Sequence, residues 1–441
     1  MTLARPEPGP PPPYTPPMET SFALDNGLRG TLVQVGSIPM AAVRLVLHTG
    51  AAHVPAGQTW LDRFVHEYLK EGTESLDAAA LADAVASIGG RLNVDSDEHT
   101  TVVRAEVLAE HAPRAVELLA EVARRPRFPD SEAPRLLADL RRNLDLVLSQ
   151  PQALAQARFR RALYGEHPYG RVLPEPETLD GFDVDAARSF WTERVNASST
   201  RLMVAGRFDE DAVMEVSARA LGDWAAGNEP AVSPAQPARR RTVQLVDRAG
   251  AEQTTLRLGL PVPDPSRHDY VALEVTNALL GGSFHSRITL NIREQKGYTY
   301  SPRSGISARP ADAYWVQAAD VTTDVTGPAM REILGEIERL ASEAPSEEEL
   351  AGIQNYVAGS FVMRQATPGA ILNWLEFLDL HGLDSEYTAS YIERVRAVSP
   401  EEVRRITAEY IRPDEMTVTA IGDRAVIEDQ LAAFGELEAG G

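Results

Sequence analysis

Two blocks of this 441-residue chain repeat the same succession of patterns, about half a chain length apart. Residues 184–206 contain a helical pattern, a short loop and an apolar strand that ends in Gly206. Residues 401–422 follow the same order and end in Gly422, which lies 216 positions later (422 − 206). The repeat predicts two homologous halves of about 200 residues each, an ordinary size for a domain.

The boundaries of these halves follow from the composition. Residues 1–17 include eight prolines and almost nothing that could enter a core, so we expect an extended, polyproline-like tail. Residues 229–241 are rich in proline, alanine and arginine, which is typical of a linker. The two halves then span residues 18–228 and 242–441. Both contain strand-like and helix-like segments, and we expect an α+β fold in which each half is an antiparallel-rich sheet with helices packed on one side.

The charge balance and the missing cysteines exclude several functions. With 43 lysines and arginines against 64 acidic residues the formal net charge is −21. This argues against nucleic acid or an anionic membrane as a partner, because both bind basic surfaces. No apolar run reaches the roughly 20 residues of a membrane span and the start lacks the pattern of a signal peptide, so we expect a cytoplasmic protein. Without cysteine the chain has no thiolate nucleophile and no cysteine-based zinc site.

Five short motifs carry a resemblance to a known family. They are residues 24–28 (LDNGL), 71–73 (EGT), 163–170 (LYGEHPYG), 280–284 (LGGSF) and 292–300 (IREQKGYTY). In this order and spacing they resemble the pitrilysin family of zinc peptidases, and within it the bacterial relatives of mitochondrial processing peptidase. The resemblance covers nearly the whole chain after the proline-rich tail. It also accounts for the repeat, because members of this family contain two similar α+β halves.

Active members of this family bind zinc through an H-x-x-E-H motif on the helix before a Gly-Thr pair. Counted back from Gly72 and Thr73, the corresponding positions here hold Arg63, His66 and Glu67. Arg63 takes the place of the first zinc ligand, His66 that of the general base and Glu67 that of the second ligand. A guanidinium group is cationic at physiological pH and cannot coordinate zinc. We therefore expect an ion pair between Arg63 and Glu67, and no metal in this chain.

A rearranged metal site is the alternative for this motif, and it would make the chain a self-sufficient zinc peptidase. Its ligands would be His66 and Glu67, completed by His99. Residues at i and i+1 point about 100° apart on a helix, however, so His66 and Glu67 cannot easily meet on one ion. The third, acidic ligand of the family lies on a long helix further along the chain. In this region the sequence offers only Asp139 and Asp145, and neither is a clear counterpart.

The resemblance also implies substrate contacts in the second half. In the zinc peptidases of this family, the C-terminal half or a separate subunit supplies an arginine and a tyrosine that hold the substrate backbone and stabilise the oxyanion. Arg293 and Tyr300 match this pair, and Tyr298 competes for the tyrosine role. A glycine-rich substrate loop precedes the pair in the family. Its counterpart here consists of Gly281, Gly282, Ser283 and Phe284.

Together these resemblances imply a zinc-free subunit of a heterodimeric peptidase. We expect no catalytic residue and no cofactor in this chain itself. A homologous partner with an intact H-x-x-E-H motif would hold the zinc, and Arg293 and Tyr300 would contact the peptide bound there. The substrate would be an extended peptide or unfolded segment, held through its backbone at a sheet edge. A further alternative is a non-enzymatic scaffold, similar to the core subunits of respiratory complexes that resemble this family.

Overall fold

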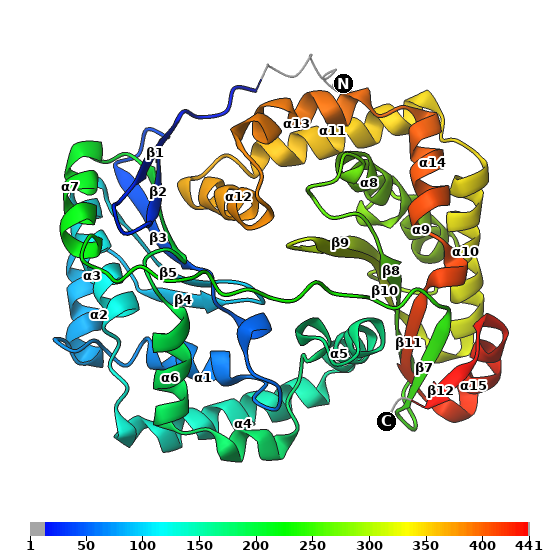
Figure 1. The fold of residues 1–441 in the computed structure, drawn as a ribbon. Helices are drawn as coiled ribbons and strands as arrows, with labels where there is room; N and C mark the ends of the chain where they lie inside the picture. Colours follow the sequence, from blue (N-terminus) through cyan, green and yellow to red (C-terminus); the bar gives the residue numbers. More distant parts are fainter. Residues whose placement is uncertain (1–13, 440–441) are drawn as a thin grey trace, which may run out of the picture.

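Two six-stranded mixed sheets lie on opposite sides of the molecule, one from each half of the chain (Figure 1). This computed structural model describes residues 14–439. Most of the tail predicted for residues 1–17 therefore lies outside the described residues. The predicted α+β class with two sheet-and-helix halves is confirmed. No described helix has both the length and the apolar character that a membrane span requires.

The N-terminal sheet has the strand order β1-β2-β6-β3-β5-β4. Its neighbouring strands run antiparallel except β2 and β6, which are parallel. Asn26 and Gly27 form the turn between the first two strands, where Gly27 has a φ of +87° that favours glycine. The strands are β1 (Glu19–Ala23), β2 (Arg29–Gln34), β3 (Met40–Leu47), β4 (Asn93–Ser96), β5 (Thr101–Leu108) and β6 (Thr200–Gly206).

The C-terminal sheet has the corresponding order β12-β7-β11-β8-β10-β9. Neighbours among β12, β7 and β11 are parallel, and the other neighbours are antiparallel. The strands are β7 (Thr242–Asp247), β8 (Gln253–Pro261), β9 (Arg303–Arg309), β10 (Asp312–Thr322), β11 (Thr417–Gly422) and β12 (Leu437–Ala439). β6 lies between β2 and β3, and β11 lies in the same place between β7 and β8. The repeat predicted from the two glycine-ended strands is thus confirmed.

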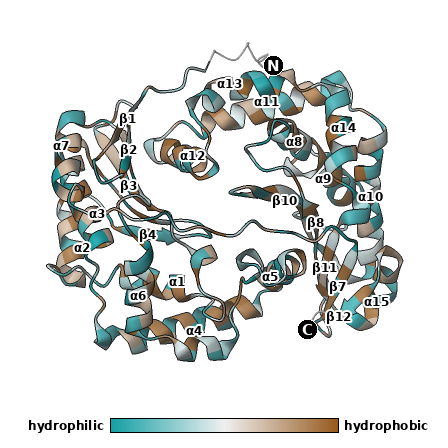
Figure 2. Ribbon diagram, viewed as in Figure 1, coloured by the Kyte–Doolittle hydropathy of each residue, from teal (hydrophilic) through white to brown (hydrophobic). Residues whose placement is uncertain are grey.

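Helices cover the outer side of each sheet, and Figure 2 shows hydrophilic stretches on outer helices such as α13 and α14. Side-chain caps explain where several helices begin: Asp183 accepts the N–H of Ala186 at the start of α6, and Ser399 accepts that of Glu402 at the start of α14. The first half contains α1 (Leu61–Tyr68), α2 (Ala78–Ser87), α3 (Ala112–Arg124), α4 (Ala133–Ser149), α5 (Pro151–Tyr164), α6 (Val184–Arg194) and α7 (Glu210–Leu221). The second contains α8 (Tyr270–Asn277), α9 (Arg287–Thr289), α10 (Thr326–Ser342), α11 (Glu347–Met363), α12 (Pro368–His381), α13 (Ser385–Ala397), α14 (Pro400–Tyr410) and α15 (Arg424–Leu431).

One helix of each half crosses to the sheet of the other half. α5 packs on β8 and β11, whereas α12 packs on β3 and β6. The two are equivalent elements of the repeat, because their first residues lie 217 positions apart (368 − 151). Alternation along β3 explains how both of its faces are covered: Val43 and Leu45 join the core of their own half, whereas Ala42 and Val46 join the cluster that contains Leu372 of α12. The two halves are therefore interlocked.

The segment between α7 and β7 crosses from one half to the other without a helix or a strand (Figure 1). It contains the predicted linker of residues 229–241. The backbone N–H of Ala238 donates to the carbonyl oxygen of Leu163 on α5 at 2.7 Å. The carbonyl oxygen of Ser233 lies 2.9 Å from Nε2 of His167. These bonds hold the linker against the junction of the two halves.

Candidate functional site

The residues predicted to contact substrate lie together at one cavity beside the C-terminal sheet. The cavity has a volume of about 620 Å³. Its wall includes the predicted arginine and tyrosine as well as the glycine-containing segment, namely Arg293, Tyr300, Gly281, Gly282, Ser283 and Phe284. Residues predicted to act together, but separated by up to 19 positions in sequence (300 − 281), thus meet at one open site.

Arg293 is sandwiched by aromatic rings at this cavity. Its guanidinium carbon lies 4.3 Å from the ring centroid of Phe284 and 5.1 Å from that of Tyr300. A guanidinium stacked on ring faces keeps its N–H donors directed outward in its own plane, where they can meet an acceptor. Its one ion pair within the described chain is with the adjacent Glu294, at 3.3 Å. Tyr300 is 81% exposed and Phe284 is 57% exposed, so both rings are open to a partner or a ligand.

Tyr298 does not share this position. Its side chain is only partly exposed and packs against the core of the C-terminal half. Its backbone N–H donates to the carbonyl oxygen of Ile292 at 2.8 Å, which fixes the turn after the arginine. Tyr298 is not among the residues that line the cavity. The geometry therefore favours Tyr300 over Tyr298 for contact with a ligand at this site.

Close packing explains why glycine occupies two positions of the predicted substrate loop. They belong to a π-helical segment, η6 (Ala278–Gly282), that follows α8. A Cβ on Gly281 would lie 2.6 Å from the side-chain oxygens of Ser304 and Gln317, and one on Gly282 would lie 2.5 Å from the amide nitrogen of Asn277. Gly281 thus allows a close approach to β9 and β10, and Gly282 a close approach to Asn277 at the end of α8. The segment is part of the framework of the cavity.

The charged side chains of the cavity wall are mostly basic. Arg257 and Arg303 line it together with Arg293, against one acidic residue, Asp320. Burial lowers the pKa of Arg257, whose Nε atom is buried and has no hydrogen-bond partner among the described residues. Asp320 accepts a bond of 3.2 Å from the side-chain amide of Gln152 at the start of α5. Such a surface suits the carbonyl or carboxylate oxygens of a peptide.

The degenerate zinc motif lies on α1, and the ion pair predicted there is wrong. Glu67 pairs with Lys70 at 2.5 Å, one helical turn further on. Arg63 turns the other way, and its guanidinium carbon lies 4.1 Å from the ring centroid of Trp60. The i to i+4 spacing allowed a pair between Arg63 and Glu67, but each side chain has a nearer partner on its own side.

The remaining side chains of the motif do not fit a zinc ion either. Nε2 of His66 is hydrogen-bonded to the carbonyl oxygen of Val94 on β4, and burial lowers the pKa of His66. Nε2 of His99 lies 2.9 Å from the hydroxyl of Tyr169. Within residues 14–439 no group of three or more His, Cys, Asp or Glu side chains could hold a metal ion. The rearranged site of His66, Glu67 and His99 is therefore not assembled, and a cation occupies the position of the first ligand.

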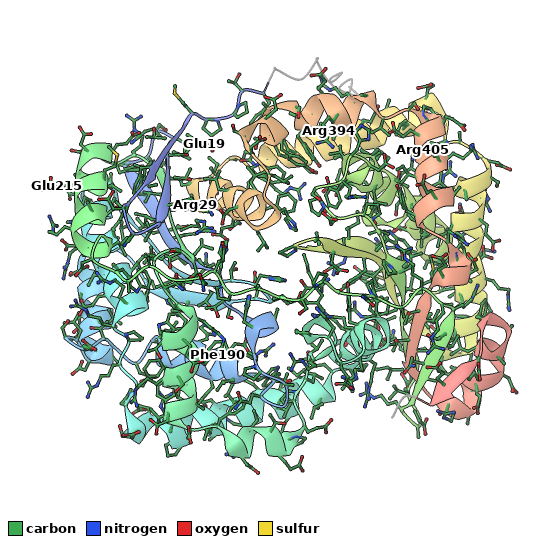
Figure 3. All side chains as sticks on the ribbon, viewed as in Figure 1. Glu19, Arg29, Phe190, Glu215, Arg394 and Arg405 are labelled. Atoms are coloured by element: carbon green, nitrogen blue, oxygen red, sulfur yellow. The ribbon has the colours of Figure 1, made fainter. Side chains whose placement is uncertain are left out.

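Buried charges that the sequence analysis missed join the two halves. Side chains from both sheets project into the space between them (Figure 3). Asp379 on α12 accepts from Nε of Arg201 on β6 at 3.0 Å and bonds Nε2 of His48 at 2.8 Å. Glu229 of the linker pairs with the same two bases. Burial alone would lower the pKa of His48, but its bonds to Asp379 and Glu229 outweigh burial and raise it. The sequence did offer one signal of such buried pairs. Arg44 lies inside the apolar strand β3, and a buried charge needs a partner.

Comparison with known proteins agrees with this architecture. Residues 33–177 match the family model described as Insulinase (Peptidase family M16), and residues 181–357 match the one described as Peptidase M16 inactive domain. The chain belongs to peptidase family M16. Its resemblance to zinc peptidases of this type is confirmed at the level of the family.

Relatives across bacteria share most of the length of this M16 chain. It is 22% identical to an uncharacterized zinc protease of Streptomyces coelicolor, over 91% of this chain and 89% of the relative. A second uncharacterized zinc protease, from Bacillus subtilis, is 25% identical over 64% of this chain and 68% of its own length. Among solved structures, a peptidase M16 inactive domain from Pseudomonas fluorescens superimposes with a TM-score of 0.83 at 20% identity, covering 92% of this chain and 98% of its own. A protease from Helicobacter pylori superimposes with a TM-score of 0.86 at 17% sequence identity, covering 92% of this chain and 99% of its own. These structures share the fold.

Proposed function

We propose that this chain is the zinc-free, substrate-contacting subunit of a two-chain M16 peptidase. The observation that carries the proposal is the basic cavity at which Arg293 and Tyr300 meet on the surface. The helix that holds zinc in active relatives carries Arg63 here, and its other motif residues are engaged elsewhere. A homologous partner with an intact H-x-x-E-H motif would therefore supply the zinc, which activates a water molecule for attack on a peptide bond.

The side chains at this cavity have a defined role in the proposal. The guanidinium of Arg293 and the hydroxyl of Tyr300 donate hydrogen bonds to a substrate carbonyl and to the oxyanion that develops from it. Stacking between Phe284 and Tyr300 holds the guanidinium in place before substrate arrives, so little reorganisation is needed in the transition state. Two largely exposed aromatic side chains also suit a surface that a second subunit covers.

The substrate in this proposal is an extended peptide or an unfolded segment. β4 and β9 are edge strands of their sheets. Arg303, at the start of β9, lines the Arg293 cavity. An extended peptide that adds to a sheet edge forms hydrogen bonds through its backbone, so its side chains contribute little to recognition. The edge at β9 would hold the peptide, and Arg293 would reach the bond to be cleaved.

Reconstitution of this chain with a homologue that has an intact H-x-x-E-H motif tests the proposal. We expect no peptidase activity from this chain alone, even when loaded with zinc, and activity from the pair. Arg293→Ala or Tyr300→Phe in this chain should each lower kcat of the pair by about 10²-fold or more, as the loss of one oxyanion donor does. Tyr356→Phe is the matched control, because Tyr356 is 51% exposed on α11 and outside the cavity.

The outcomes separate the proposal from its alternatives. Peptidase activity of the isolated, metal-loaded chain would favour a self-sufficient enzyme and overturn the proposal. Full activity of a pair that contains Arg293→Ala and Tyr300→Phe would favour a scaffold. A rise in KM with unchanged kcat would show that Arg293 and Tyr300 bind the substrate equally in the ground state and the transition state. It would contradict their role at the oxyanion.

A further inference from the structure

A second cavity, of about 390 Å³, lies between the two halves, and four arginines and three acidic residues line it. Its wall comes from α1, α5, β9 and the loop segments near residues 51–54, 97–99 and 168–172. Four arginines from four different segments meet there, although the chain as a whole carries a net charge of −21. They are Arg63, Arg160, Arg171 and Arg309.

Two of these arginines share one carboxylate. Arg160 and Arg309 are buried, and both form ion pairs with Glu98. Burial alone would raise the pKa of Glu98, but the two guanidinium groups outweigh burial and lower it. Glu98 is therefore ionised at neutral pH and fully engaged by this pair. It leaves no acceptor for the other two arginines.

Arg171 is the arginine that most lacks a partner. One of its terminal nitrogens, Nη2, donates to the carbonyl oxygen of Val54 at 3.1 Å. Its Nε and Nη1 atoms are buried and have no acceptor among the described residues. Buried N–H donors of a charged group are costly to leave unsatisfied. The Nε–H group and the neighbouring N–H of Nη2 form one edge of a guanidinium, and this edge matches the two oxygens of a carboxylate or phosphate group.

Arg63 is the second arginine without a carboxylate partner. It forms no ion pair with any residue in the part of the chain that the structure describes, and it lies against the ring of Trp60. The adjacent Asp62 is buried and its pKa is raised to about 6 by burial. Asp97 is committed to the backbone, because its carboxylate accepts the N–H groups of His99 and Thr100, each at 2.7 Å. Among the described residues, neither acid comes within ion-pair distance of Arg63.

Trp60 forms the wall between these two arginines in a strained backbone conformation. It has a φ of 79° at the start of α1, in the left-handed region that a bulky residue rarely adopts. Its indole N–H donates to the carbonyl oxygen of Val172 at 3.0 Å, next to Arg171. One ring face carries the guanidinium of Arg63. Strain of this kind persists where the surrounding structure holds a side chain in place, and it gathers at ligand sites.

We propose that this cavity binds the anionic group of a small ligand, a carboxylate or a phosphate, through Arg171 and Arg63. The volume is that of a small-molecule site and has room for a compact organic acid or the last residue of a peptide. The Trp60 ring gives the ligand an apolar surface beside the charge. The site is separate from the Arg293 cavity and shares no residue with it. It requires no partner subunit.

Calorimetric titration of the full chain alone tests this site. The probes are the dipeptide acid benzoyl-Gly-Phe, the same compound with a C-terminal amide, and inorganic phosphate. We expect the acid to bind about ten-fold or more tightly than the amide, because the amide lacks the charge. Arg171→Gln and Arg63→Gln should each weaken binding of the acid by about ten-fold. Arg248→Gln, an exposed arginine in the turn after β7, should leave binding unchanged.

A change in fold is separated from a change in binding by a second variant. Arg171→Lys keeps a donor for the Val54 carbonyl but loses the two-pronged contact, so it should fold and still bind the acid weakly. Displacement of the acid by phosphate identifies a site for either anion, and failure of phosphate to displace it identifies a carboxylate site; both support the proposal. Equal binding of acid and amide, unchanged binding by the Arg63 and Arg171 variants, or no binding of either anion at millimolar concentration would overturn it. Because no partner is present, none of these results bears on the role of Arg293.

Discussion

Replacing Glu376 by alanine would leave the guanidinium of Arg44 without its counter-ion at the junction of the two halves. Arg44 is 4% exposed on β3, and it reaches across to α12. There it bonds Glu376 at 2.5 Å, Asn373 Oδ1 at 2.7 Å and the carbonyl oxygen of Gly369 at 2.8 Å. Removing one partner of a buried ion pair costs about 3–5 kcal/mol. Because two neutral acceptors remain, we expect the free energy of unfolding to fall by about 3 kcal/mol, the lower end of this range.

Urea unfolding, followed by circular dichroism and tryptophan fluorescence, measures this loss. Glu428→Ala is the matched control, because it removes the acid of an exposed pair with Arg424 at 2.9 Å that should contribute about 0.5 kcal/mol or less. Replacing Arg44 by Met and Glu376 by Leu together should recover much of the stability, because no buried charge is left unpaired. If Glu376→Ala cost no more than Glu428→Ala, the bonds of Arg44 to α12 would not stabilise the fold.

Two further predictions concern pH. Asp379 and Glu229 raise the folded-state pKa of His48 above its usual 6.5, so its stabilising contribution is complete below pH 6.5 and is lost as the pH rises through the folded pKa. Thermal melts from pH 5 to 9 should show this loss in the wild type but not in His48→Gln, and identical profiles would contradict it. Bonds from Arg405 lower the pKa of Asp269 to about 2, so its contribution is present above pH 4 and disappears as the pH falls toward 2. After solvent screening, Asp269→Asn should cost about 1 kcal/mol at pH 7 and only a small fraction of that near pH 2, where the folded carboxyl is half protonated, measured by urea unfolding at both values.

The repeat could be predicted from local patterns, and the residues that meet at the Arg293 cavity could be identified from the family resemblance. An apolar strand closed by Gly206 or Gly422 identifies a central strand in either half, whatever surrounds it. Residues 292–300 turn back on themselves, and the bond from the N–H of Tyr298 to Ile292 places the arginine and Tyr300 on one side. The resemblance identified these residues, and the short spacing explains why they lie together.

The crossing helices could not be predicted from the same patterns. The apolar positions of α12 show that one side of the helix is buried, but they carry no information about which sheet buries it. The pair expected between Arg63 and Glu67 failed for a related reason: helical spacing identified a possible contact, while Trp60 and Lys70 offered nearer ones. Arg171 gave no signal, because 41 of the 43 basic residues are arginines and a single arginine in a loop is unremarkable.

The exchange of α5 and α12 has a consequence for synthesis on the ribosome. The N-terminal sheet is complete once Gly206 has emerged, yet the helix that covers its second face ends only at His381. Until then Ala42 and Val46 present an apolar surface to water or to a chaperone. A nascent chain stalled before residue 368 should therefore bind chaperones. The two halves, made as separate polypeptides, should each be prone to aggregate until they associate.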